Sequence, residues 1–295
     1  MLDYSQKYKE YLLNVKKVSS NTLEAYLRDV LQLNTYCTIN GMSDIKEVDD
    51  TFFEKYLTYL DFLGKSDSTK SRITASLKCY FKFLNSCGYC SLNPMVNIKT
   101  HKVKRKLPDV LESAEIMQLL SQPDTSDYKG YRDKAMLELL YATGIKVSEL
   151  IEIDINNINL QIGILNLYNT KHERVIPIYP AALKHLGEYI SSVRPAIVQN
   201  SNEAHLFTNM NGQPMTRQGF WKIIKHYAEK AGIKKDITPH TLRHSFAAHL
   251  LENGAQLKDI KDMLGHSDIS STQVYAQFVK NKYIHSYAQF HPFAK

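Results

Sequence analysis

The regular spacing of apolar residues is interrupted between Cys87 and Pro108, and this interruption limits how the chain can fold. Before it, apolar residues recur at intervals of three and four, the spacing of amphipathic helices. Within it, glycine, proline and a run of basic residues replace any period, which is typical of a linker between domains. The sequence therefore predicts a helical domain over residues 1–98, a basic linker over 99–107 and a second domain over 108–295.

Two helices of the first domain can be located. One is expected to begin at Asn21, whose side chain can cap the first turn while Glu24 completes a capping box. Another is expected over residues 68–84, with an apolar stripe on one side. Its other side carries lysines spaced by multiples of four residues, Lys70, Lys78 and Lys82. These lysines form either a solvated face or part of a DNA-binding surface.

The second domain is predicted to be mainly helical with one β segment. Residues 163–168 and 174–178 alternate apolar and polar side chains around a polar stretch, which indicates a β-hairpin. Helices are expected over residues 216–230, 239–252 and 257–264, each ended by a nearby glycine. The fold class is therefore mainly α with a small β-sheet.

Composition restricts the partners and the compartment. Lys plus Arg exceed Asp plus Glu by 37 to 30, a formal charge of +7, which favours a polyanionic partner. No apolar run approaches the ~18 residues that span a bilayer, and the first residues lack the apolar core of a signal peptide. We therefore expect a cytoplasmic protein without a membrane partner.

The cysteines do not form a recognisable metal site. Cys87 and Cys90 have the two-residue spacing of zinc ligands, but a second ligand pair is missing from the sequence. Ordinary thiols in a reducing compartment are expected, with a redox pair or a metal site as the alternatives. The sequence also lacks a phosphate-binding glycine loop and the carboxylate and histidine cluster of a two-metal nuclease. No metal or cofactor is therefore predicted.

Lys146 and His266 both lie where a helix is expected to end. Lys146 follows Gly144, at which one helix stops before the next begins near Ser148. His266 comes directly after Gly265, which marks the end of another helix. Side chains beside such breaks project into a cleft more readily than side chains in the middle of a helix.

The helix expected from residue 239 offers a phosphate site at its first turn. Thr238 suits the N-cap and Pro239 the first helical position. His240 and Arg243 then lie on one face, beside unpaired backbone N–H groups and the positive end of the helix dipole. Groups of this kind bind phosphate.

Other aromatic and histidine residues have a simpler interpretation. Tyr275 lies in a short amphipathic stretch, but the chain has 19 tyrosines, so frequency alone makes it a packing residue. His244 and His249 are interpreted as structural residues of their helix.

Four segments together resemble the catalytic domain of tyrosine site-specific DNA recombinases: ATGIKVSEL, the hairpin, PHTLRHSFAAHL and LGHSDISSTQVY. The overall length, the ending HPFAK and a first domain similar to the family's helical core-binding domain resemble the Xer branch. The resemblance covers nearly the whole chain. It implies an enzyme that cleaves and rejoins DNA through a 3′-phosphotyrosyl intermediate in Xer-type chromosome dimer resolution. A mobile-element or phage integrase of the same family and a catalytically impaired DNA-binding variant are the alternatives.

The resemblance also implies the roles of individual residues. Tyr275 would be the nucleophile, His240 and Arg243 the histidine and second arginine that hold the scissile phosphate, and His266 the second histidine. Glu149 matches an acidic residue that supports the first arginine of the family.

The sequence departs from the family at two positions. Lys146 stands where the family has its first arginine. A lysine cannot give the two-pronged contact of a guanidinium, so DNA binding is expected to survive while cleavage weakens. Lys171 is the candidate general acid of the hairpin, but Xer-like hairpins usually hold this lysine nearer the position of Asn169.

The expected partners follow from the resemblance and from the charge pattern. They are double-stranded DNA with an inverted-repeat recombination site, a homo- or heterotetramer on paired sites and, as one option, a protein activator. The two domains are expected to grip one duplex through basic residues, Lys70, Lys78, Lys82, Lys102, Lys104, Arg105 and Arg217. Residues 280–295 are expected to dock on a neighbouring subunit, with packing on their own domain as the alternative.

Overall fold

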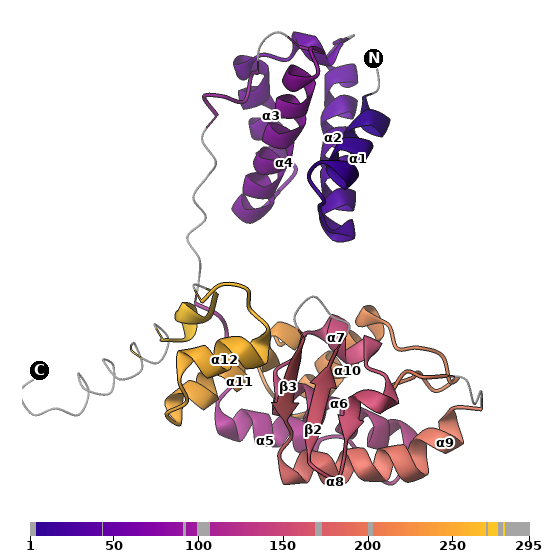
Figure 1. Ribbon diagram of the computed structural model, residues 1–295. Helices are drawn as coiled ribbons and strands as arrows, with labels where there is room; N and C mark the ends of the chain where they lie inside the picture. Colours follow the sequence, from indigo (N-terminus) through magenta and orange to yellow (C-terminus); the bar gives the residue numbers. More distant parts are fainter. Residues whose placement is uncertain are drawn as a thin grey trace, which may run out of the picture. The chain divides into compact units, whose positions relative to one another are not determined.

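The computed structural model describes residues 4–42, 44–90, 93–98, 107–168, 173–199, 203–269, 271–276 and 280. The chain divides into two compact units, Met1–Arg105 and Lys106–Lys295 (Figure 1). This division falls within the basic run that the sequence suggests as a linker. Five residues named from the sequence lie outside the described residues: Lys102, Lys104, Arg105, Asn169 and Lys171.

The first unit packs its helices around an aromatic core. Its described helices are α1 (Ser5–Asn14), α2 (Ser20–Ile39), α3 (Asp50–Phe62) and α4 (Asp67–Ser86), with a 3₁₀ turn at Ile45–Glu47. Tyr8 from α1, Tyr56 from α3 and Tyr80 from α4 are fully buried. Such large rings supply much of the apolar area that stabilises a small helical domain.

Helix α2 begins earlier than the sequence suggested. Its N-cap is Ser19, which has an extended backbone (φ −66°, ψ 156°) and accepts a hydrogen bond from the backbone N–H of Thr22. Asn21 already lies inside the first turn, so the predicted capping box of Asn21 and Glu24 is wrong. Serine and asparagine cap helices about equally well, so capping preference alone did not distinguish Ser19 from Asn21.

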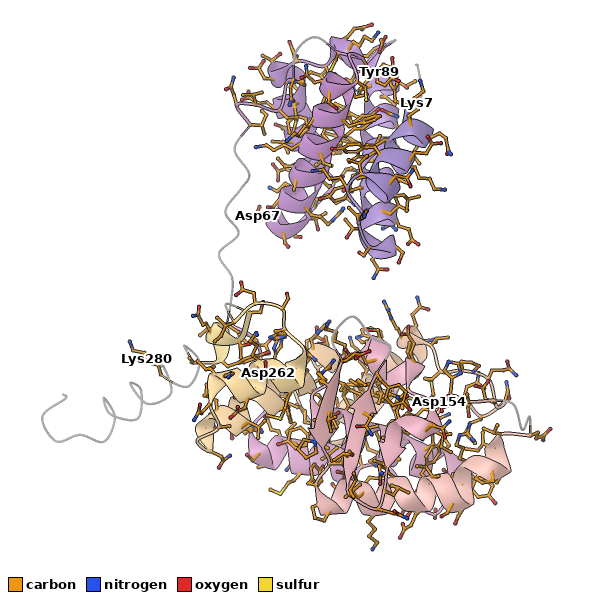
Figure 2. The ribbon with its side chains drawn as sticks, in the orientation of Figure 1. Lys7, Asp67, Tyr89, Asp154, Asp262 and Lys280 are labelled. Atoms are coloured by element: carbon orange, nitrogen blue, oxygen red, sulfur yellow. The ribbon has the colours of Figure 1, made fainter. Side chains whose placement is uncertain are left out.

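Helix α4 has the buried apolar stripe that the sequence predicted, but its lysines differ in their surroundings. The Lys70 ammonium forms ion pairs with Asp61 and with Asp67, the latter at 2.9 Å (Asp67 is labelled in Figure 2). Lys82 is exposed and Lys78 is half-buried. Lys70 therefore adds little free positive charge to this face, and these ion pairs weigh against its predicted role in DNA binding.

The second unit combines helices with a small antiparallel sheet. Its described helices are α5 (Ser113–Ser121), α6 (Tyr128–Thr143), α7 (Val147–Glu152), α8 (Pro180–Glu188), α9 (Arg194–Ile197), α10 (Arg217–Lys230), α11 (Pro239–Glu252) and α12 (Leu257–Leu264). Its strands are β1 (Ile158–Asn159), β2 (Ile164–Leu167) and β3 (Arg174–Pro177), in the order β1-β2-β3. Short 3₁₀ and π turns lie at Ile155–Asn157 and Tyr189–Val193.

The predicted elements of this unit are confirmed. In the β2–β3 hairpin Leu165 pairs with Ile176, and both side chains are fully buried. Helices α11 and α12 begin and end as predicted, and α10 begins one residue later because Thr216 is its N-cap. Strand β1 was missed, since two residues carry too little alternation to be recognised.

Helix α6 positions the site. It is buried along most of its length and packs against α5, α8 and α11. It ends at Gly144, whose φ of 58° lies in the left-handed region that favours glycine. The ring of Phe246 on α11 occupies the space that a Cβ at this position would need. Only glycine therefore permits this turn, which leads the chain past α11 directly before Lys146.

No helix in the described parts of the chain combines the length and the hydrophobicity of a membrane span.

Candidate active site

Arg243 connects the two helix ends that the sequence singled out. Its guanidinium donates hydrogen bonds to the carbonyl oxygens of Gly144 (2.6 Å) and Leu264 (2.7 Å). The residue is 4% exposed, and this burial, opposed by the charge of Glu149, holds the pKa of Arg243 below its ordinary value. A guanidinium has five N–H donors, so two bonds to the backbone do not exhaust its capacity to hold a phosphate.

Glu149 lies in the first turn of α7 and is bound from two sides. Its Oε2 accepts a hydrogen bond from the backbone N–H of Lys146 at 2.7 Å. Arg174, the first residue of β3, donates to Oε1 at 3.0 Å and to Oε2 at 2.9 Å. The Nε of Arg174 also donates to the carbonyl oxygen of Met263 at 2.7 Å. Arg174 thus joins the hairpin to α7 and to the end of α12, which Figure 1 shows next to β3.

The charge state of Glu149 follows from these contacts. Burial opposes ionisation, but the hydrogen bonds from Arg174 and from the backbone of Lys146, together with both positive charges, hold the pKa of Glu149 below its ordinary value. The carboxylate is therefore ionised at neutral pH. It forms a two-pronged ion pair with a guanidinium, the strongest geometry available to such a pair.

Sequence reasoning gave Arg174 no role in the site. A signal was present, because side chains two apart on a strand share a face and the residue two positions after Arg174 is the apolar Ile176. An arginine that shares a face with a buried residue has to find a partner inside the protein.

Tyr275 is 1% exposed and packs against Phe246, Ile260 and Leu264. Its hydroxyl shares a hydrogen bond of 2.8 Å with Nδ1 of His244. Burial raises the pKa of Tyr275, and the charge of Arg243 opposes this effect. The nucleophile candidate is therefore a neutral phenol at pH 7.

His244 is the second residue whose importance the sequence reasoning missed. It was interpreted as structural, yet it contacts the hydroxyl of Tyr275 from a position one helical turn after His240. The i, i+4 spacing to His240 was the available signal, because residues four apart share a helix face. For His249 the structural interpretation stands, because its ring is buried and hydrogen-bonded to Tyr141.

His266 and His240 differ in exposure. His266 follows Gly265, whose φ is 63°, and its Nδ1 shares a hydrogen bond of 3.0 Å with the Thr272 hydroxyl. Burial first, and then the charges of Arg243 and Lys146, lower the pKa of His266 to about 4. His240 is exposed, and its ring centroid lies 6.3 Å from that of His244.

The other described residues with a predicted role lie elsewhere in their units. Arg217 is exposed at the start of α10, and Lys70, Lys78 and Lys82 lie in the first unit. All four cysteines are free thiols, and the described residues contain no cluster of three potential metal ligands.

The clustered groups suit the chemistry of a phosphate diester. Arg243 and Lys146 supply positive charge, which lowers the pKa of His266. Tyr275 supplies a hydroxyl next to the same group of residues. Cations of this kind can bind a phosphate and stabilise the charge that develops when a hydroxyl attacks it.

Comparisons with known proteins agree with this description. Residues 109–282 match the phage integrase family, and residues 6–88 match the SAM-like N-terminal domain of phage integrases. Tyrosine recombinase XerD of Staphylococcus epidermidis is 42% identical over 97% of this chain and 98% of that protein. Tyrosine recombinase XerD of Staphylococcus aureus is 41% identical over the same shares.

Solved structures share the fold. The XerH site-specific recombinase bound to a palindromic difH substrate matches with a TM-score of 0.77 at 19% identity, over 96% of this chain and 84% of that chain. A lambda integrase dimer bound to a core site matches with a TM-score of 0.70 at 18% identity, over 92% and 93%. The fold class and the enzyme class predicted from the sequence are confirmed. The chain belongs to the phage integrase family and is a tyrosine recombinase that carries out site-specific DNA recombination.

Proposed function

We propose that this recombinase acts in the cytoplasm on inverted-repeat sites in Xer-type chromosome dimer resolution, with Tyr275 as its nucleophile. One observation carries the assignment of the site. Arg243, His244 and Tyr275 come from two separate segments, yet their side chains meet beside the ends of α6 and α12. This chain aligns with nearly the whole length of the XerD proteins, which supports the Xer branch over a mobile-element integrase.

The proposed mechanism needs no cofactor. Arg243, Lys146 and His240 hold the scissile phosphate, and His266 stabilises the charge of the transition state. The hydroxyl of Tyr275 loses its proton to a neighbouring base as its oxygen bonds to phosphorus and the bond to the 5′ oxygen breaks, and Lys171 protonates that leaving oxygen. The product is a 3′-phosphotyrosyl link, whose bond energy permits rejoining without ATP.

A suicide substrate tests this proposal. A nicked half-site duplex loses a short strand after cleavage, so the covalent adduct accumulates and can be resolved on a denaturing gel. We expect adduct with the native chain and none with Tyr275→Phe. Tyr189→Phe is the matched control, because Tyr189 is also buried with a hydrogen-bonded hydroxyl, at 3.0 Å from the carbonyl oxygen of Leu206. An adduct formed by Tyr275→Phe would refute the assignment.

We expect both units to contact the DNA backbone. Lys82 is exposed on α4 and Arg217 on α10, and such cations release counterions when they bind phosphates. The logarithm of affinity should therefore fall with the logarithm of salt concentration by about 0.9 for each neutralised phosphate. Deletion of residues 1–98 should reduce both the affinity and this slope, measured by fluorescence anisotropy. A truncated chain that binds as tightly as the full chain would contradict the prediction.

We expect residues 280–295 to be exchanged between subunits of a tetramer. Most of these residues lie outside the described part of the chain, but their sequence places Ile284, Tyr287 or Ala288, and Phe290 on one helical face. A pocket of about 380 Å³ between α6, β3, α11 and α12, lined in part by Leu250 and Met263, offers an apolar surface for them.

Removal of the residues after Phe278 should therefore abolish assembly on paired sites while leaving binding to a single site. Sedimentation of protein with each DNA measures both. Unchanged assembly would show that the segment packs on its own subunit.

A further inference from the structure

Helix α11 carries two similar histidine–tyrosine hydrogen bonds. Nδ1 of His244 lies 2.8 Å from the hydroxyl of Tyr275, and Nδ1 of His249 lies 2.9 Å from the hydroxyl of Tyr141. Both tyrosines have a pKa raised by burial. The pairs differ in one respect that matters for chemistry, since only Tyr275 is the proposed nucleophile.

The surroundings of His244 keep its ring neutral. Burial first, and then the positive charges of His240 and Arg243, lower the pKa of His244 to about 4, against the effect of Asp109. His266 after α12 is within electrostatic reach as well and is itself neutral. A neutral imidazole has one nitrogen that accepts a hydrogen bond, so Nδ1 can accept the O–H of Tyr275.

The other two histidines are placed differently. Nδ1 of His266 is hydrogen-bonded to the Thr272 hydroxyl, and His240 is exposed with its ring beside that of His244. In the described part of the chain, the hydrogen-bond partner of the Tyr275 hydroxyl is Nδ1 of His244.

We propose that His244 is the general base that removes the proton of Tyr275 during attack on the phosphate. As the tyrosine oxygen bonds to phosphorus, its proton passes to Nδ1 of His244, and the released 5′ oxygen takes a proton from the general acid. In rejoining, the 5′ hydroxyl attacks, the bond from phosphorus to the tyrosine oxygen breaks, and His244 returns the proton to that oxygen. The negative phosphate beside the ring stabilises the imidazolium that forms. The inference rests on the proposed role of Tyr275.

His244→Asn tests the base role separately from the positioning role. The asparagine side chain can still accept a hydrogen bond near the position of Nδ1, but it cannot take up a proton. Adduct formation under single-turnover conditions should slow by about 10²-fold at pH 7, the lower end of the range for general base catalysis. The rate of the variant should also rise about tenfold per pH unit between roughly pH 7 and 9, because solvent must now ionise the tyrosine. The native rate should change much less over this range.

His249→Asn is the matched control, because it alters the second histidine–tyrosine pair of the same helix. It should leave the rate and its pH profile unchanged on a half-site, where exchange of residues 280–295 plays no part. His244→Ala provides an independent measurement, since added imidazole can enter the space left by the ring and restore adduct formation. The same addition should have no effect on His249→Ala.

Three results would overturn the inference. The first is a His244→Asn variant whose adduct-formation rate and pH profile equal those of the native chain. The second is a loss of rate in His244→Asn that is the same at every pH, together with no rescue of His244→Ala by imidazole. The third is a loss of rate in His249→Asn as large as that in His244→Asn. Tyr275→Phe distinguishes these failures from failure of the proposed function. If Tyr275→Phe is inactive while His244→Asn is normal, the nucleophile is correctly assigned and only the base is wrong.

Discussion

Lys146→Arg is expected to raise the rate of Tyr275–DNA adduct formation by about a hundredfold, because it restores a donor with two aligned N–H groups. A missing donor to a developing oxyanion costs roughly 3 kcal/mol, which corresponds to about that factor. The positive charge of Lys146 contributes to lowering the pKa of His266, so the lysine already has an electrostatic effect on the site. DNA affinity should change little, because the formal charge and the number of released counterions are the same.

Time courses on a suicide substrate and binding isotherms on intact DNA measure the two effects. Lys184→Arg, at an exposed position on α8, is the control for a lysine-to-arginine change outside the site. Equal cleavage rates for Lys146 and Lys146→Arg would mean that a lysine is adequate here. A native chain that binds DNA without cleaving it, together with an active Lys146→Arg, would instead identify a catalytically impaired variant.

Arg174→Gln is expected to destabilise the second unit by roughly 3 kcal/mol, because removal of one partner leaves the other charge buried and uncompensated. The side chains of Arg174 and Glu149 are 7% and 14% exposed. The change also removes the hydrogen bond to the carbonyl oxygen of Met263. A loss of this size lowers the melting temperature by about 6–12 °C for a domain of this size, and cleavage should fall because α7 and α12 lose their common anchor.

Two further variants show whether the ion pair is the cause. Lys235→Gln breaks the more exposed pair with Glu115, at 2.7 Å, and should cost less than about 1 kcal/mol. Glu149→Gln combined with Arg174→Gln should recover part of the loss, because it removes the unpaired buried carboxylate. Equal melting of Arg174→Gln and Lys235→Gln would contradict the prediction.

The effect of Arg174→Gln should depend on pH. The pKa of Glu149 in the folded chain lies below its ordinary value. The ion pair therefore stabilises the fold fully at pH values above that ordinary pKa. This stabilisation is lost as the pH falls through the lowered pKa. The difference in melting temperature between the native chain and Arg174→Gln should therefore be full at neutral pH and shrink in acid.

The sequence alone determined the elements whose signals are local. Helix α11 could be located to the residue because Thr238 accepts a hydrogen bond from the backbone N–H of Thr241, only three residues away, with Pro239 at the first helical position. The left-handed Gly265 likewise ended α12 where predicted. Local signals failed where two neighbours were both suitable, as with Ser19 and Asn21, or where a strand had only two residues, as in β1.

Tertiary structure alone decided which side chains meet in the site. Arg174 and Glu149 are 25 residues apart, and His244 and Tyr275 are 31 apart. Lys70 had the spacing of a DNA-binding residue, but Asp61 on the neighbouring helix α3 pairs with it. Capping and periodicity depend on residues within one or two turns and can be recognised in a sequence. Ion pairs and hydrogen bonds between distant segments depend on how those segments pack, so the partners of Arg174 and His244 emerge only in the folded chain.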